Sequence, residues 1–172
     1  MKQKILALAA ALAVAATGVW AEGAPSDTVQ KKPASPVKLE TRSYQLKIVK
    51  TKEGKLVKKW VPAGKVVPGE VVRYVTTVEN RGEMPMEKVR IVNPIDPHLS
   101  YVARSAKCAG TCTIRFSVDG GRHFDTPERL VVMDKKGKKR QARPVDYNAI
   151  EWVLDRIDAK KESSVEFKAK LK

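Results

Sequence analysis

The chain is poor in cysteine, histidine and aromatic residues, and it has a single long apolar run. Two Cys and two His in 172 residues are too few for an array of zinc fingers, and two Cys are too few for a disulfide-dense small domain. The apolar run lies at the N-terminus, which excludes a channel built from several membrane-spanning helices. The length corresponds to one domain.

Acidic residues are also scarce relative to basic ones. Lys and Arg total 34 and Asp and Glu total 19, so the formal net charge is +15. Two segments hold the excess: residues 31–65 contain 11 basic and 2 acidic side chains, and residues 134–143 contain 6 and 1. Outside these segments and the first 21 residues the charges nearly balance. An anionic partner is therefore expected at one or both segments.

The N-terminus has the pattern of a secretory signal peptide. Lys2 and Lys4 precede the apolar stretch 5–16, and small Ala21 ends a suitable cleavage site. The apolar stretch is short for a membrane span, which favours cleavage after Ala21 over a retained anchor. Residues 1–21 are thus predicted to be removed, leaving no transmembrane span. We expect the mature protein in the periplasm or at the cell surface.

The rest of the chain is predicted to be a flexible linker, residues 22–37, followed by one all-β domain, residues 38–172. The linker contains three Pro among Ala, Ser and Lys, a composition that cannot bury a core. The domain alternates apolar and polar residues in short segments separated by turn residues, which is typical of an antiparallel β-sandwich. Strands are expected at residues 44–48, 56–61, 72–79, 89–93, 99–103, 114–118, 130–133, 150–155 and 164–171.

Four motifs from Val67 onward follow one another in a known order. They are Val67-Pro68-Gly69-Glu70 before a strand with Val72, Tyr74 and Val78; Val78-Glu79-Asn80-Arg81-Gly82; Val89 to Ile95 with Leu99 to Val102; and Ile150-Glu151-Trp152 with Ser163 to Lys170. The ordered set resembles the bacterial conserved repeat domain family, also called domain of unknown function 11.

The resemblance implies an immunoglobulin-like β-sandwich in a secreted or cell-surface protein, with a structural or interaction role and no catalytic residues. Asn93 stands where the family usually has Asp, and residues 134–143 read as an insertion. Large aromatic side chains contribute most buried area, so Trp152, Tyr74 and Phe167 are expected in the core. Asn80 and Gly82 suit a turn at a strand end, where positive φ is tolerated.

Cys108 and Cys112 flank a short segment in which Gly110 permits a tight reversal. In an oxidising compartment this spacing predicts a disulfide across a turn, worth roughly 2 kcal/mol for a five-residue loop. A redox pair would favour the Cys-x-x-Cys spacing, and a metal site would need further ligands, whereas His98 and His123 are distant in sequence. A reduced, buried pair is the remaining alternative.

Catalytic and metal-binding patterns are weak. Residues 117–121 resemble a calcium loop but supply one carboxylate where an EF-hand needs several, so a hairpin turn is expected there. Asp96 and His98 share a loop, yet two His and the lack of Gly-x-Ser-x-Gly give a hydrolytic triad no support. We therefore expect no enzyme activity, no cofactor and no metal site.

The basic segment 134–143, with sequence DKKGKKRQAR, is the main candidate for binding. Its partner is expected to be an anionic glycan or lipid, or an envelope protein. Nucleic acid matches the charge but is disfavoured by the export signal and the lack of aromatic clusters for base stacking. A solvated, flexible insertion is the competing interpretation. The candidate anion-binding residues are Lys135, Lys136, Lys138, Lys139, Arg140, Arg143, Lys58 and Lys59.

These features together predict a noncatalytic structural or interaction module of the bacterial cell envelope. Its basic segments would attract an anionic envelope component. The alternative is a periplasmic accessory protein that binds a protein partner by adding a strand at a sheet edge.

Overall fold

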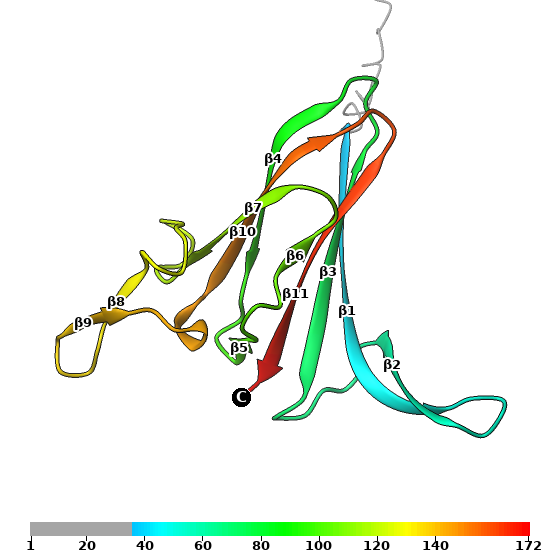
Figure 1. Ribbon diagram of the computed structural model, residues 1–172, viewed down its shortest axis with the longest axis horizontal. Helices are drawn as coiled ribbons and strands as arrows, with labels where there is room; N and C mark the ends of the chain where they lie inside the picture. The colour runs from blue at the N-terminus through cyan, green and yellow to red at the C-terminus, as the bar shows by residue number, and fades with distance from the viewer. Residues whose placement is uncertain (1–35) are drawn as a thin grey trace, which may run out of the picture. The chain divides into compact units, whose positions relative to one another are not determined.

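The structure, a computed structural model, describes residues 36–172, and period-two alternation of apolar and polar residues marks several of its strands. These residues form an all-β, immunoglobulin-like sandwich of antiparallel sheets (Figure 1), as predicted. The predicted signal peptide and residues 22–35 of the predicted linker lie outside the described residues. The strands are β1 (Val37–Lys50), β2 (Leu56–Pro62), β3 (Val71–Asn80), β4 (Met86–Pro94), β5 (Leu99–Tyr101), β6 (Lys107–Cys108), β7 (Cys112–Ser117), β8 (Val131–Met133), β9 (Lys139–Gln141), β10 (Ala149–Ile157) and β11 (Glu162–Leu171).

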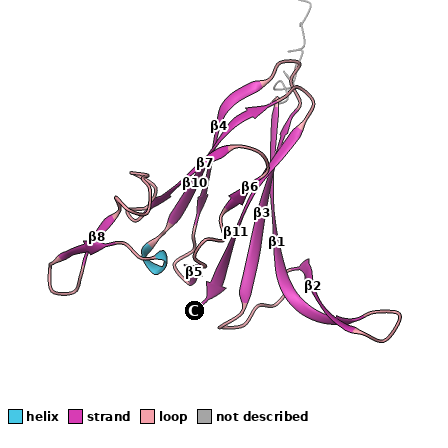
Figure 2. Cartoon of the chain, in the orientation of Figure 1, coloured by secondary structure: helices cyan, strands magenta, loops and turns pink. Residues whose placement is uncertain are grey.

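The strands form two packed sheets and one separate hairpin. The larger sheet has the order β2-β1-β3-β11-β5, and β6 also pairs with β11. The smaller sheet has the order β4-β10-β7, and β8 pairs only with β9. A single short 3-10 helix, η1 (Pro144–Asp146), connects β9 to β10 within the described residues (Figure 2).

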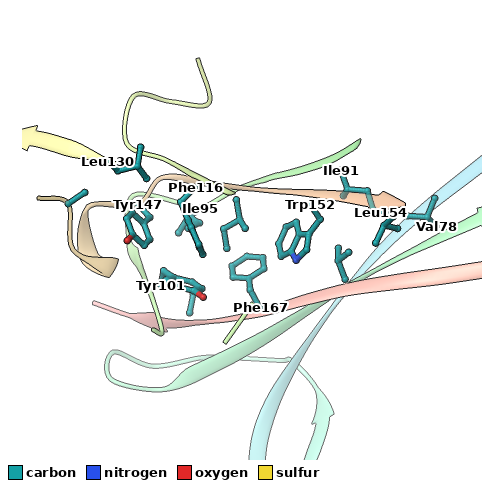
Figure 3. Packing of buried hydrophobic residues seen from close by; sticks show 14 of the residues in the cluster. Val78, Ile91, Ile95, Tyr101, Phe116, Leu130, Tyr147, Trp152, Leu154 and Phe167 are labelled. Carbon is teal, nitrogen blue, oxygen red and sulfur yellow. The ribbon is translucent and has the colours of Figure 1, made fainter. Parts of the chain in front are cut away.

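The core lies between the inward faces of the two sheets (Figure 3). Trp152 on β10 is fully buried and faces Phe167 on β11, with ring centroids 6.1 Å apart. These two predicted core residues are confirmed. Tyr74 is only partly buried: it stacks on Phe167 at 5.0 Å, and its other side borders an open cavity that Asn93 and Asp96 also line.

Asn80 ends β3 as predicted, but its role is larger than that of a turn residue. Its side chain is 1% exposed, and its Nδ2 lies within 3.2 Å of the carbonyl oxygens of Met84, Ile157 and Asp158. Its Oδ1 accepts a hydrogen bond from the Gly82 backbone N–H at 3.0 Å. Neither Asn80 nor Gly82 adopts a positive φ, although a turn at this strand end would tolerate one. Asn80 instead ties the β3–β4 turn to the β10–β11 turn.

Two short strands differ from the sequence expectation. The segment 134–143, expected as a loop, contains β9, which pairs with β8 through Val131–Gln141, Val132–Arg140 and Met133–Lys139. β6 is likewise a two-residue strand on β11. Both are too short to show alternation, and their pairing comes from the partner strand.

Candidate anion-binding surfaces

The tip of the β8–β9 hairpin presents four lysines to solvent. Asp134 Oδ1 accepts hydrogen bonds from the backbone N–H groups of Lys136 and Lys138, each at 2.8 Å, and Gly137 adopts the positive φ that the tight turn requires. The carboxylate is therefore occupied by the backbone of its own turn. Lys135, Lys136, Lys138 and Lys139, which we call the tip lysines, are all exposed and form no ion pair within residues 36–172.

Arg140 and Arg143, predicted to belong to the same set, are placed differently. Arg140 faces inward on β9 beside Val132 and donates two hydrogen bonds to Asp146 in η1. The Arg140 guanidinium, with the Arg143 N–H, lowers the pKa of Asp146 to about 2. Arg143 is 68% exposed, and its Nε lies 4.0 Å from Asp146. Arg140 thus fixes the hairpin to η1, whereas Arg143 keeps most of its charge accessible.

A shallow cavity of about 440 Å³ brings part of the predicted set together. It is lined by Lys135, Lys136, Arg140 and Arg143, with Met133 and Asp134. Lys138 and Lys139 do not line it. An anionic group could approach three accessible cations here without displacing an existing partner.

Lys58 and Lys59 belong to a second hairpin, formed by β1 and β2. Lys58 pairs with Ile48 and Lys59 pairs with Lys47, so the two lysines project from opposite faces of the strand pair. Residues 46–60 hold six lysines and one acidic residue, Glu53. All six are exposed, and none forms an ion pair in the described part of the chain.

A charged cluster that the sequence did not reveal lies on the outer face of the smaller sheet. Glu151 on β10 is 1% exposed, ion-paired with Arg90 on β4 and, at 2.6 Å from Oε2 to Nη2, with Arg115 on β7. The loop after β7 covers it, and Phe124 lies 5.4 Å from the Arg90 guanidinium. In the sequence, each of these three charged residues has an apolar neighbour on both sides. Only the pairing of the strands brings the three side chains together.

This cluster forms the floor of an open cavity of about 630 Å³. Its rim includes exposed Arg122 and Arg129, but Arg90 and Arg115 share the single negative charge of Glu151. The nearby Asp119 accepts hydrogen bonds from the backbone and ring of His123, which lower the pKa of Asp119. The cavity therefore offers less free positive charge than either lysine hairpin.

The predicted disulfide between Cys108 and Cys112 is confirmed. Cys108 ends β6 on the larger sheet and Cys112 begins β7 on the smaller sheet. The bond closes the turn where the chain crosses from one sheet to the other. The disulfide lies outside both lysine hairpins, in sequence and in strand order, and its position indicates a structural role.

Elsewhere, the Asp96–His98 pair lies exposed on the surface, with Oδ1 and Nδ1 2.9 Å apart. Residues 36–172 contain no group of three or more His, Cys, Asp or Glu arranged to hold a metal ion. Within the same residues no helix is long and apolar enough to cross a membrane.

Comparison with known proteins gives a weak structural match. No family model matches the chain, and no curated protein matches it. A solved structure from Corynebacterium diphtheriae, of a protein described as membrane anchored, aligns with a TM-score of 0.43 and 16% sequence identity. The alignment covers 82% of this chain and 29% of the other, so this chain spans less than a third of that protein. A likeness this low carries no argument about function.

Proposed function

We propose that the protein is a noncatalytic, exported interaction module of the bacterial cell envelope, which binds an anionic envelope component through its two lysine hairpins. One observation carries the proposal: six lysines on the β1–β2 hairpin and the four tip lysines are exposed and unpaired among the described residues. The export signal in the sequence and the disulfide, which persists in oxidising compartments, support an envelope location.

The hairpins differ from the rest of the surface in how their charges are balanced. Elsewhere many basic side chains pair with acidic ones, as in Arg73–Glu166, Arg156–Asp158 and Lys160–Glu83. On the hairpins the acidic residues are Asp134, held by its own turn, and a lone Glu53. Charges a few ångströms apart add their fields within a Debye length of about 10 Å, so each hairpin attracts anions as a unit.

The alternative, strand addition at a sheet edge, is disfavoured at two edge strands of the described sheets. The edge strand β2 carries Lys58 and Lys59, and the edge strand β4 carries Lys88 with φ 51°. Charged side chains and local kinks at edges are features that discourage pairing with another chain. Recognition by charge therefore fits the surface better than recognition by backbone pairing.

The test is neutralisation of the tip lysines. The variant K135Q/K136Q/K138Q/K139Q leaves Arg140 in place because that side chain holds Asp146. A matched control, R104Q/K107Q/K161Q/K170Q, removes four exposed charges outside the hairpins. Binding to phosphatidylglycerol vesicles and to heparin, an anionic glycan, is measured at low salt.

We expect the tip variant to bind at least about tenfold more weakly, since each lysine near an anionic surface contributes about 1 kcal/mol. The control variant should stay within about twofold of the wild type if position matters more than net charge. Equal weakening in both variants, or none in the tip variant, would contradict the proposal. A salt-insensitive protein partner recovered from envelope extract would favour the strand-addition alternative.

A further inference from the structure

The β1–β2 hairpin extends beyond the sheet to which it belongs. β1 pairs with β3 from Val37 to Gln45, whereas it pairs with β2 from Tyr44 to Lys50. Residues 46–50 and 56–60 therefore form a two-stranded ribbon without a third strand beside it. In Figure 1 this ribbon (cyan) projects past the end of β3.

One face of the ribbon combines aliphatic side chains with lysines. Facing pairs across the two strands are Leu46–Trp60, Ile48–Lys58 and Lys50–Leu56. Leu46, Ile48 and Leu56 are 44%, 66% and 73% exposed, which is high for large aliphatic residues so close together. We call Leu46, Ile48, Lys50, Leu56, Lys58 and Trp60 the hairpin face.

Trp60 marks the inner boundary of the hairpin face. It is partly buried, and the ammonium group of Lys168 on β11 lies 5.5 Å from its ring centroid. An indole ring with one apolar side and one polar contact is the kind of group that settles at the boundary between water and lipid. Trp60 is also a spectroscopic reporter of this face, since the core residue Trp152 is already shielded from water and the third tryptophan, Trp20, belongs to the predicted signal peptide.

We propose that the hairpin face docks on the surface of an anionic lipid bilayer, with Leu46, Ile48 and Leu56 entering the headgroup layer. This inference rests on the proposed function and names lipid as the anionic component at this hairpin. Charge complementarity supports it: residues 46–60 carry a net charge of +5. Lysine stems lie along apolar surface while their ammonium groups reach the lipid phosphates.

The salt dependence of binding distinguishes a lipid surface from a soluble polyanion. Lysine–phosphate attraction is screened by salt, whereas transfer of aliphatic side chains out of water is not weakened by it. Docking on lipid should thus keep a salt-resistant part that depends on Ile48 and Leu56. Binding to heparin should have no such part.

The experiment compares I48T/L56T with L39T/V92T, measured on vesicles of phosphatidylcholine with phosphatidylglycerol and on heparin. The second variant is a matched control because Leu39 and Val92 are 58% and 38% exposed and lie outside residues 46–60 and outside the β8–β9 hairpin. Thr keeps a high strand propensity at these exposed positions. Equal urea midpoints for the variants and the wild type verify that folding is unaffected.

We expect I48T/L56T to bind vesicles about tenfold more weakly at high salt, while its heparin affinity stays within about twofold of the wild type. L39T/V92T should behave like the wild type on both probes. Anionic vesicles should shift Trp60 emission to shorter wavelength, and the shift should vanish in W60F.

Unchanged vesicle binding by I48T/L56T, or equal loss on vesicles and heparin, would overturn lipid docking. Heparin binding that survives such a result would leave the proposed function standing, whereas a wild type that binds neither probe would contradict the proposed function itself. A wild-type dimer that becomes monomeric in I48T/L56T, seen by sedimentation equilibrium, would assign the hairpin face to a second copy of the chain and also overturn the proposal.

Discussion

Arg140 and Asp146 form a two-bond ion pair at the base of the β8–β9 hairpin, with Nη1 to Oδ2 at 2.7 Å and Nη2 to Oδ1 at 2.8 Å. A paired donor fork of this kind fixes both position and orientation. It gives the hairpin a fixed attachment to η1 while the tip lysines remain free. The basic segment 134–143 is thus an anchored structural element with an exposed charged end.

The Arg140–Asp146 pair predicts a specific acid dependence of stability. Because pairing lowers the pKa of Asp146 from 3.8 to about 2, its contribution is present above pH about 4 and is lost as pH falls towards 2. D146N should remove this part of the pH dependence and lower stability at neutral pH by about 1 kcal/mol. Urea unfolding from pH 2 to 7 measures both effects; identical pH profiles for the two proteins would contradict the assignment.

Removing the buried carboxylate of Glu151 should lower the free energy of unfolding more than removing an exposed carboxylate on the same strand. Replacement by Gln removes the charge that balances Arg90 and Arg115, whose side chains are 57% and 40% exposed and can turn towards water. E151Q should therefore destabilise the fold by about 1–3 kcal/mol. D155N is the control: Asp155 pairs with exposed Lys88, so its loss should cost at most about 0.5 kcal/mol. Similar losses in both variants would show that burial of Glu151 is unimportant.

The Cys108–Cys112 disulfide predicts a modest stabilisation because the closed loop is short. C108S/C112S should lower the free energy of unfolding by about 2 kcal/mol, and chemical reduction of the wild type should give the same loss. Urea unfolding with and without reductant measures it. Mass spectrometry of the native protein that finds two free thiols would contradict the bond.

The hydrogen bonds of Asn80 predict an unusual order of stability for two variants, N80A and N80D. N80A leaves three carbonyl oxygens without their shared donor and should cost about 2 kcal/mol. N80D should cost more, although it is closer in shape, because its carboxylate cannot donate and faces those oxygens. Thermal or urea unfolding of the two variants gives the order, and N80D as stable as the wild type would refute this role.

The alternation of residues predicted the fold well where a strand has one buried face and one wet face. Strands β3 and β11 follow this rule, and Trp152 and Phe167 lie in the core as expected. The predicted linker ends at residue 37, whereas β1 begins at Val37. The strand starts before residue 44, where its apolar alternation begins, because its first residues pair with β3.

The candidate site was predictable in composition but not in geometry. Nothing in the segment 134–143 distinguishes Arg140 from Lys139; the difference comes from the β8 register and from Asp146 beyond the segment. Likewise, Lys58 and Lys59 are neighbours in sequence, and strand pairing separates them onto opposite faces. Alternation with Ile150 and Trp152 places Glu151 on the outward face of its strand, and its burial depends on a loop distant in sequence.

The salt dependence of binding to isolated bacterial envelopes tests the central claim most directly. The measurement compares the wild type, the tip-lysine variant and a variant with Lys47, Lys50, Lys52, Lys55, Lys58 and Lys59 changed to Gln, each from low to high salt. If the two hairpins bind an anionic component, wild-type affinity falls steeply with salt and each variant shows both weaker binding and a shallower slope. Equal affinities and slopes for all three proteins would contradict the account.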